Sequence, residues 1–494
     1  MYMKNVNITT TNGYNKTIKV KNNVKENEFW KKVSVCLTEI DFPTKFEVDY
    51  EGDWASFEVS KRGTYTKNGI KMPSMYVKPI FNNICLDFEP YEEKYLTCIN
   101  TESNNYKFYH LRPDNIREVI DATYGRIGSE RGEAFGVKDL QEPYESYLFW
   151  IRYYEKLSKG YTDQTSIYLK KDESEEDEEE ISTETEVKEE KISKVSVELY
   201  DMLKRYAQHI VDETFCNNTV TKKQCEETRR LLNTLGEQTD IKDFNNILQQ
   251  ILVLSPRKAR YITEFLARNS GDFSRIVQRE ENLLGAMEAL VDIPQKKNIK
   301  SYTDKFKAMG IEVYEANEEQ KEQVIRHLSD GLDGKIVKIY RVINKEHQKR
   351  FNKYLKSHKI KRVHQYWHGS TNENWLSIIQ NGLQLNPNAR ITGKMFGYGI
   401  YFAPRARKSF GYTSCNGSYW ARGNSNRGFM GLYATAVGNP DYVHSAGHYN
   451  QAELDRKGYN CVFAKAENTG LRNDEIIFYR EDAVCLNYIV EFSA

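Results

Sequence analysis

Three groups of residues in the last third of the chain carry side chains that could bind a flat heterocycle bearing an amide. The run Tyr366–Ser370, YWHGS, contains His368, and the run Met395–Ala403, MFGYGIYFA, contains Tyr401. The third group is Lys408–Tyr412, KSFGY. Glycines let a ligand approach the backbone closely, aromatic rings offer stacking faces, and backbone amides and hydroxyls supply hydrogen bonds. Together these groups have the chemistry of a small-molecule site.

The apolar pattern predicts the elements that would position these groups. A strand should end near His368, and the spacing of apolar residues after Trp375 favours a short amphipathic helix that stops at Asn381 and Gly382. Glycines should then turn the chain into a strand at Ile400–Ala403.

Taken together, these motifs resemble the catalytic domain of the poly(ADP-ribose) polymerases, which are diphtheria-toxin-like ADP-ribosyltransferases. The family carries a histidine, a tyrosine and a glutamate on separate strands. His368 and Tyr401 match the first two, and the run Asn473–Tyr479, NDEIIFY, makes Glu475 the third. The resemblance implies NAD as co-substrate, with His368, Tyr401 and Glu475 as the catalytic residues.

The resemblance also implies how NAD is held. Glu475 would bind the nicotinamide-ribose hydroxyl while positive charge develops at the anomeric carbon, and would orient the incoming hydroxyl. Gly369 and Ser409 would bind the carboxamide. Tyr412 would stack on the nicotinamide ring, with Tyr401 forming the opposite wall.

Three further residues have implied roles at this site. His368 would hold the adenosine ribose, Ser370 would lie near the adenine end, and Lys408 would act electrostatically. Gln384 stands where the family often has arginine, and Arg390 in the loop Asn386–Gly393 is a candidate to replace that charge. A glutamate in the third position permits chain elongation without deciding between chains and single transfer.

The composition of the chain limits which compartments and which metal sites are expected. The 494 residues have a net charge of +1 and a mean hydropathy of −0.71. We expect no membrane span, because no run of 18 apolar residues occurs, and secretion is not expected, because the N-terminus lacks an apolar leader. None of the eight cysteines has a CxxC spacing, so the sequence predicts no zinc finger and we expect no metal site. Scattered thiols of this kind fit a reducing interior.

The length predicts two to four domains. We expect a multidomain α+β chain with β-rich N-terminal modules, an all-α regulatory domain and a mixed β-sheet ADP-ribosyltransferase domain. The expected segments are an unassigned small β-rich region (1–90), a WGR-like domain (91–170), an acidic disordered linker (171–191), a helical regulatory domain (192–293) and the catalytic domain (297–494). Residues 172–190 hold twelve Asp/Glu and one Lys, a local charge of −11, so the balancing basic excess lies mainly in 191–494.

Residues 91–170 resemble the WGR domain that precedes the catalytic part in DNA-dependent members of the family. The pattern predicts strands at Tyr95–Asn100 and Tyr106–Leu111, a turn at 124–128 and a helix at Pro143–Ser158. Tyr124 stands where the name-giving tryptophan is expected, and Arg126 follows at the matching position. The resemblance implies contacts of this pair with DNA or a neighbouring domain. A module that makes only protein contacts is the alternative.

Residues 192–293 show helical periodicity. The predicted helices are Val195–Val211, Thr221–Leu235, Asp243–Leu254, Pro256–Arg268 and Ser274–Val291. Their order resembles the regulatory domain of the family, and Glu281–Leu284 matches the segment that faces the NAD site there. Gly285 stands where the family has a second acidic residue.

The resulting functional prediction is an NAD-dependent protein ADP-ribosyltransferase, making chains or oligomers and stimulated by DNA ends or nicks. Its acceptors would be proteins, including its own acidic segment, and the family suggests a nuclear location. The alternatives are a DNA-independent mono-ADP-ribosyltransferase and a non-catalytic scaffold that binds NAD or ADP-ribose.

Overall fold

The computed structural model describes residues 3–10, 13–21, 23–43, 45–50, 53–58, 66–67, 70–71, 85–87, 90–100, 105–127, 138–139, 144–145, 148–169, 193–216, 220–258, 261–291, 304–328, 331–385, 395–415 and 425–494. The chain forms two compact units. One comprises Met1–Lys171 with Pro256–Glu264, and the other comprises Asp172–Ser255 with Phe265–Ala494. The acidic segment and Arg390 lie outside the described residues.

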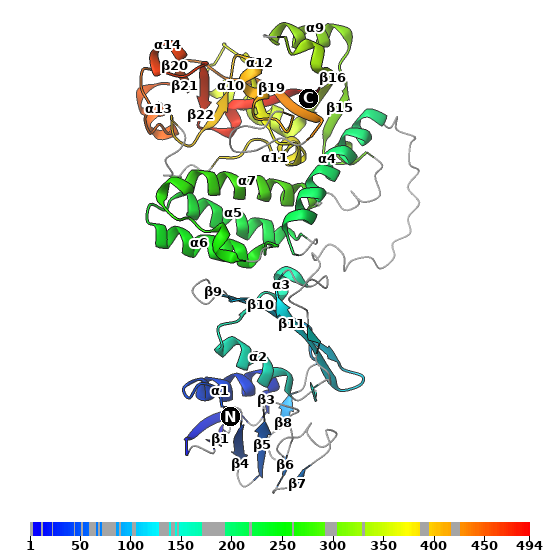
Figure 1. Ribbon diagram of the computed structural model, residues 1–494, viewed down its shortest axis with the longest axis vertical. Helices are drawn as coiled ribbons and strands as arrows, with labels where there is room; N and C mark the ends of the chain where they lie inside the picture. The colour runs from blue at the N-terminus through cyan, green and yellow to red at the C-terminus, as the bar shows by residue number, and fades with distance from the viewer. Residues whose placement is uncertain are drawn as a thin grey trace. The chain divides into compact units, whose positions relative to one another are not determined.

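The first unit begins with a sheet that confirms the β-rich prediction. Its strand order is β2-β1-β4-β5-β6-β7 (Figure 1). These strands are β1 (Met3–Thr10), β2 (Asn15–Lys21), β4 (Lys45–Tyr50), β5 (Asp53–Glu58), β6 (Thr66–Lys67) and β7 (Ile70–Lys71), and a separate pair joins β3 (Asn23–Lys25) to β8 (Cys85–Asp87). Within the last strand pair, Lys67 pairs with Ile70. The sequence prediction missed helix α1 (Glu26–Thr38), which buries Phe29, Trp30 and Val33.

A second sheet in the same unit has the order β12-β11-β10-β9-β14, with β13 also paired to β11. It contains β9 (Lys94–Asn100), β10 (Asn105–Asp114), β11 (Val119–Arg126), β12 (Lys138–Asp139), β13 (Tyr144–Glu145) and β14 (Thr162–Asp163). The two long predicted strands are confirmed. The predicted turn at 124–128 is wrong over its first part, because Tyr124 pairs with Tyr109 and Arg126 with Lys107 within a regular ladder.

Helix α2 (Phe149–Ser158) begins later than the predicted start at Pro143. The reason is that β13 first pairs with β11. Leu148 and Ile151 pack into the core of the N-terminal sheet, whereas Phe149 packs into the core of the second sheet. The helix therefore contributes to both cores. The short α3 (Thr165–Tyr168) follows it.

The second unit starts with four long helices, α4 (Lys194–Thr214), α5 (Lys222–Gly236), α6 (Ile241–Leu254) and α7 (Phe273–Leu290) (Figure 1). Thr221 is the N-cap of α5 and forms a capping box with Gln224. The predicted helix Pro256–Arg268 is wrong. Pro256 disfavours helix in the residue before it, so α6 stops at Leu254 and only a 3₁₀ turn at Ile262–Phe265 follows.

Two sheets build the rest of the second unit, and they contain the predicted strand near His368 and the predicted strand that begins at Ile400. One has the order β15-β16-β23-β19-β17 and the other β18-β22-β21-β20. The strands are β15 (Ile311–Glu315), β16 (Ile336–Asn344), β17 (His364–Ser370), β18 (Ile400–Phe402), β19 (Arg427–Thr435), β20 (Pro440–Val443), β21 (Cys461–Ala464), β22 (Glu475–Phe478) and β23 (Val484–Ser493). The helices among them are α8 (Lys305–Ala308), α9 (Glu318–His327), α10 (Lys345–Ser357), α11 (Trp375–Asn381), α12 (Ala406–Phe410), α13 (Gln451–Lys457) and α14 (Ala466–Thr469).

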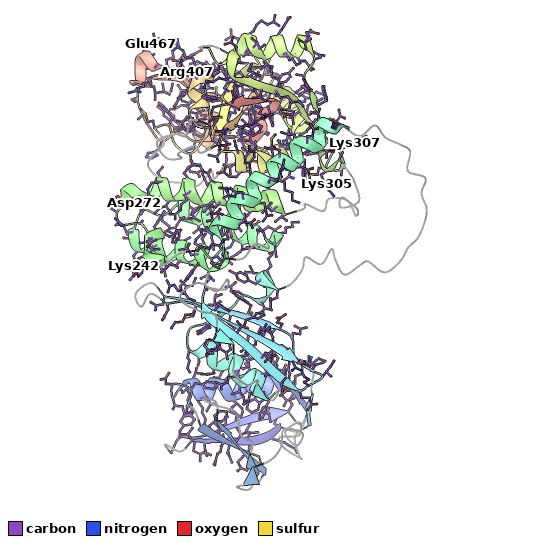
Figure 2. The ribbon with its side chains drawn as sticks, turned by 45° about the vertical axis from the view of Figure 1, so that its right-hand side comes forward. Lys242, Asp272, Lys305, Lys307, Arg407 and Glu467 are labelled. Carbon is purple, nitrogen blue, oxygen red and sulfur yellow. The ribbon has the colours of Figure 1, made fainter. Side chains whose placement is uncertain are left out.

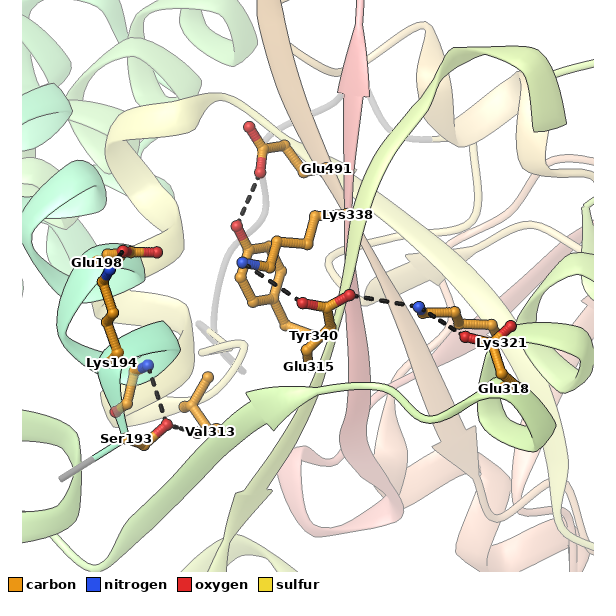
Figure 3. Close-up of polar contacts among 11 residues, drawn as sticks. Ser193, Lys194, Glu198, Val313, Glu315, Glu318, Lys321, Lys338, Tyr340 and Glu491 are labelled. Carbon is orange, nitrogen blue, oxygen red and sulfur yellow. Dashed lines mark hydrogen bonds and ion pairs between the residues drawn. The ribbon is translucent and has the colours of Figure 1, made fainter. Parts of the chain in front are cut away.

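The first turn of α4 is fastened to the edge strand β15. The Ser193 hydroxyl accepts a hydrogen bond from the Ser196 amide as N-cap and donates one to the Val313 carbonyl at 3.0 Å (Figure 3). Within the sheet, Tyr340 donates to the buried carboxylate of Glu491 at 2.8 Å. The helical and sheet parts of this unit are therefore joined at a defined point.

Among the described residues, no helix combines the length and hydropathy needed to cross a bilayer. Among the described residues, Cys36, Cys98, Cys415, Cys461 and Cys485 form no disulfide.

Candidate active site

The predicted histidine, tyrosine and glutamate lie on three strands that are connected through β18. Trp367 of β17 forms an isolated antiparallel bridge with Ala403, directly after β18. Tyr401 of β18 pairs with Ile477 of β22, and Glu475 begins that same strand. The His368 Nδ1 atom is 3.0 Å from the Tyr401 carbonyl oxygen. If Nδ1 carries the proton, this contact fixes the ring and leaves Nε2 to accept a hydrogen bond.

The Tyr401 side chain holds the glycine turn that precedes its own strand. Its hydroxyl donates to the Gly397 carbonyl at 2.7 Å and accepts from the Phe396 amide at 3.2 Å. Burial raises the pKa of Tyr401, and the carboxylate of Glu475 adds to that rise, so the phenol stays protonated at neutral pH.

The two glycines of this turn are required by packing. Gly397 has a φ of +76°, and a Cβ there would stand 2.7 Å from the Tyr449 carbonyl oxygen. A Cβ at Gly399 would stand 2.3 Å from Ile477 Cγ2. The sequence MFGYGIYFA is therefore needed to bring β18 against β22.

Glu475 forms an ion pair with Lys408 of α12. Their side chains are only 13% and 16% exposed, so the pair is largely removed from solvent. Glu475 also raises the pKa of Tyr412, after the larger effect of burial. Tyr401, Tyr412 and Lys408 thus surround the same carboxylate.

Gly369 and Ser409 meet at a very close backbone approach. A Cβ at Gly369 would lie 1.9 Å from the Ser409 carbonyl oxygen and 3.3 Å from Tyr412 Cβ. Ser409 is buried, and its hydroxyl donates to the Trp367 carbonyl at 2.9 Å. This contact fastens α12 to β17 beneath Tyr412, which is 48% exposed.

At the far end of β17 the structure reveals a residue that sequence reasoning missed. The Asn374 side-chain nitrogen donates to Ser370 Oγ at 3.1 Å and lies 3.0 Å from Asn282 Oδ1 on α7. Asn374 Oδ1 is buried without a hydrogen-bond partner among the described residues. A buried, unpaired acceptor beside Ser370 is a position at which a ligand donor would be stabilised.

Gly285 has a packing role in the same place. A Cβ at Gly285 would stand 2.8 Å from Asn374 Oδ1. One helical turn further, Glu288 accepts from Ser377 Oγ at 3.2 Å and is held by Arg229 at 2.7 Å. Helix α7 therefore lies directly against the strand end that carries Ser370. Gln384, the residue found where arginine is common in the family, is exposed.

No group of three or more His, Cys, Asp or Glu side chains in the described part of the chain is arranged to hold a metal ion. Tyr124 stacks on Tyr109 at a centroid distance of 5.7 Å, and Arg126 lies over the Tyr106 ring at 5.7 Å. These two residues belong to the first compact unit, whereas His368, Tyr401 and Glu475 belong to the second.

Comparison with known proteins agrees with this geometry. Residues 316–494 match the family model of the poly(ADP-ribose) polymerase catalytic domain. A putative poly [ADP-ribose] polymerase-like protein 100L of Invertebrate iridescent virus 6 is 31% identical over 186 residues, which are 35% of this chain and 97% of the viral protein.

Two cellular relatives extend the comparison. Poly [ADP-ribose] polymerase 2 of Zea mays is 23% identical over 482 residues, covering 79% of this chain and 68% of the maize protein. Poly [ADP-ribose] polymerase 2 of Homo sapiens is 42% identical over 154 residues, a quarter of each chain. The chain therefore belongs to the poly(ADP-ribose) polymerase family of NAD-dependent ADP-ribosyltransferases.

Proposed function

We propose that this chain cleaves the nicotinamide glycosidic bond of NAD at the site formed by His368, Tyr401 and Glu475. ADP-ribose is transferred to protein side chains or to a growing chain. The observation that carries this proposal is the joining of β17, β18 and β22, which brings the three residues to one place.

Glu475 is the residue that accelerates cleavage of the bond between ribose and nicotinamide. A carboxylate accepts a hydrogen bond from the nicotinamide-ribose hydroxyl and stabilises positive charge at the anomeric carbon as the bond to nicotinamide breaks. The same carboxylate orients the acceptor hydroxyl and takes up its proton. The ion pair with Lys408 holds the carboxylate in position before NAD binds.

The nicotinamide end fits the cradle at Gly369. The missing Cβ lets Ser409 and Tyr412 pack directly against β17, so the backbone groups of Gly369 lie beside them and can pair with a carboxamide. Tyr412 stacks on the ring and Tyr401 closes the opposite side. The Ser409 hydroxyl, which donates to the backbone here, can turn its lone pairs or its proton toward the amide.

The adenosine end lies toward His368 and Ser370. Asn374 lies beside Ser370 and donates to its hydroxyl at 3.1 Å, which puts a polar side chain at this end of the site. We propose that Arg390 substitutes for the family's arginine. A raised Michaelis constant for NAD in Arg390→Ala would support this role.

We also propose that the helical segment restrains the site. Asn282 of α7 shares Asn374 with Ser370, so bound adenosine and docked α7 compete for one side chain. Replacing Asn282 by alanine should increase NAD turnover in the absence of DNA, whereas unchanged turnover would contradict the restraint.

The DNA dependence is proposed from Tyr124 and Arg126 on β11 and from the length of the similarity to the maize protein. The corresponding organisation is a small β-rich region (1–90), a WGR-like module (91–170), an acidic linker (171–191), a helical regulatory part (192–293) and the catalytic part (297–494). A nuclear location, and acceptors that include the acidic segment, belong to the same proposal.

One experiment tests the activity and separates the alternatives. The full chain is incubated with labelled NAD, with and without nicked duplex DNA, beside Glu475→Gln and a Tyr124→Ala/Arg126→Ala double variant. We expect labelled chains whose formation increases with DNA, loss of 10²–10³-fold in turnover for Glu475→Gln, and loss of DNA stimulation alone in the double variant. Activity unaffected by DNA would support a DNA-independent transferase, and absence of labelled protein would support a scaffold.

A further inference from the structure

Helix α10 and the residues after it carry a concentration of positive charge that the transfer reaction does not use. Residues 345–362 contain eight Lys or Arg and one acidic residue, so the local charge is +7. All eight cations are exposed. Charge runs are commonly no more than a solvated helix face, so the arrangement of the cations has to decide whether this one binds a partner.

The buried face of α10 is apolar and occupied. Phe351 and Tyr354 are 5% and 2% exposed, and Arg480 lies over the Tyr354 ring at 4.8 Å. His347 faces Gly382, where a Cβ would be 3.3 Å from His347 Cε1. These contacts orient α10, so the opposite side is directed permanently toward solvent.

The exposed side carries a row of lysines, Lys345, Lys349, Lys353 and Lys356, which we call the α10 basic face. Successive lysines are four, four and three residues apart, which gives a rise of about 6 Å between neighbours and about 16 Å in total. Like charges at this spacing destabilise a helix by about 0.2–0.5 kcal/mol per pair. Lys345 and Lys349 are also near the helix N-terminus, where the macrodipole disfavours cations.

Local ion pairs do not offset this cost. Lys345 pairs with Glu312 at 2.7 Å. Among the residues that the structure describes, Lys349, Lys353 and Lys356 have no carboxylate oxygen within 4.0 Å. An anion bound from outside would therefore reduce the repulsion between these lysines.

The residues at the end of the helix extend the same positive charge. Lys359 adopts a φ of +53°, and the amide of the next residue, Ile360, donates to the Leu355 carbonyl at 2.9 Å. Glycine or asparagine is usual at such a left-handed C-terminal position. A lysine there is strained, and Lys361 and Arg362 follow it immediately.

We propose that the α10 basic face, together with Lys359, Lys361 and Arg362, binds the phosphate backbone of duplex nucleic acid without reading its sequence. A duplex carries one negative charge per about 1.7 Å, the densest regular array that such a row can meet. Lysines act as point charges toward phosphates and give no base readout. A membrane surface fits less well, because the exposed side of α10 has Gln348 and Asn352 beside the lysines in place of large apolar residues.

This surface lies in the catalytic part of the chain and is separate from Tyr124 and Arg126. It would add binding energy to any DNA contact made there, through release of counterions. It does not depend on the transfer activity, because binding can be measured without NAD.

The test measures fluorescence anisotropy of a labelled blunt-ended duplex of about 40 base pairs with the full chain at salt concentrations from about 50 to 200 mM. The variant is Lys349→Glu/Lys353→Glu/Lys356→Glu. The matched control, Lys222→Glu/Lys223→Glu/Lys242→Glu, makes the same charge change on exposed lysines of α5 and α6, of which Lys242 is labelled in Figure 2.

Each lost phosphate contact lowers the slope of log K against log salt by about 0.9, so the α10 variant should lose about 2.7 from the parent slope. Its affinity at the lowest salt should fall at least tenfold, with the control within about twofold of the parent. Equal slopes and affinities for the two variants would overturn the proposal. The proposal would also be overturned if ADP-ribose polymer bound to this surface while the α10 variant and the parent bound the duplex equally well.

Thermal melting identifies a variant that has lost its fold. In that case Lys349→Gln/Lys353→Gln/Lys356→Gln replaces it, since glutamine keeps helix propensity while removing charge. The neutral variant should show the same direction of change in slope, and an unchanged slope in a folded neutral variant would also overturn the proposal.

Discussion

Replacing Gly369 by alanine tests whether the close approach of β17 to α12 builds the nicotinamide end of the site. The new Cβ would begin 1.9 Å from the Ser409 carbonyl oxygen, whereas an ordinary contact is about 3.4 Å, so the two backbones would have to separate by about 1.5 Å. Backbone on both sides makes this separation costly. It would also lengthen the 2.9 Å hydrogen bond from Ser409 to Trp367.

The magnitude follows from these two effects. Overpacking costs about 1–3 kcal/mol and the lost hydrogen bond about 1 kcal/mol, which together give about 2–4 kcal/mol. For a unit of this size the melting temperature should fall by roughly 3–6 °C. The Michaelis constant for NAD should rise, because Tyr412 and the carboxamide partners move with α12.

Differential scanning calorimetry of the full chain measures the first effect, with the relevant transition identified by its stabilisation on adding nicotinamide. Gly411→Ala is the matched control on the same helix. Gly411 has a φ of −62°, and a Cβ there would be no nearer than 3.3 Å to the Lys408 carbonyl oxygen. We expect the control to change stability by less than about 1 kcal/mol. A Gly369→Ala protein that melts and binds NAD like the control would refute the reasoning.

Three further changes have defined outcomes. Burial raises the pKa of Glu26 to about 7, while hydrogen bonds from Tyr91 and Trp30 oppose the rise. The folded state therefore holds its proton more tightly than the unfolded state, so unfolding free energy should fall as pH rises from about 4.5 through 7, and Glu26→Gln should remove this slope, as measured by urea titration. Tyr401→Phe removes the hydroxyl that holds the Gly397 turn and should cost about 1–3 kcal/mol of stability with a lower kcat. Gly285→Ala should displace the Asn374 side chain and raise NAD turnover without DNA, which a steady-state assay would detect.

Local chemistry in the sequence was enough to predict much of the catalytic part. The strand before His368, the glycine turn into Tyr401 and the strand that begins at Glu475 each have a pattern with a short-range cause. The start of the helix at Thr221 was predictable for the same reason, whereas the capping box with Gln224 was seen only in the structure. The prediction failed where pairing between strands decided the conformation. At Tyr124–Arg126 we predicted a turn, but these residues pair with β10.

Only the tertiary structure decided what the remaining side chains touch. Nothing in the order of residues indicates that Asn374 joins Ser370 to Asn282, because these contacts link a strand end, a 3₁₀ turn and a helix about 90 residues apart. The role of Gly285 is likewise visible only as space for Asn374. The sequence determines which groups are chemically capable and where chain direction changes, since both depend on near neighbours. Which carboxylate meets Lys408, and which side of α10 is free to meet a phosphate backbone, depends on packing between distant segments, and so required the fold.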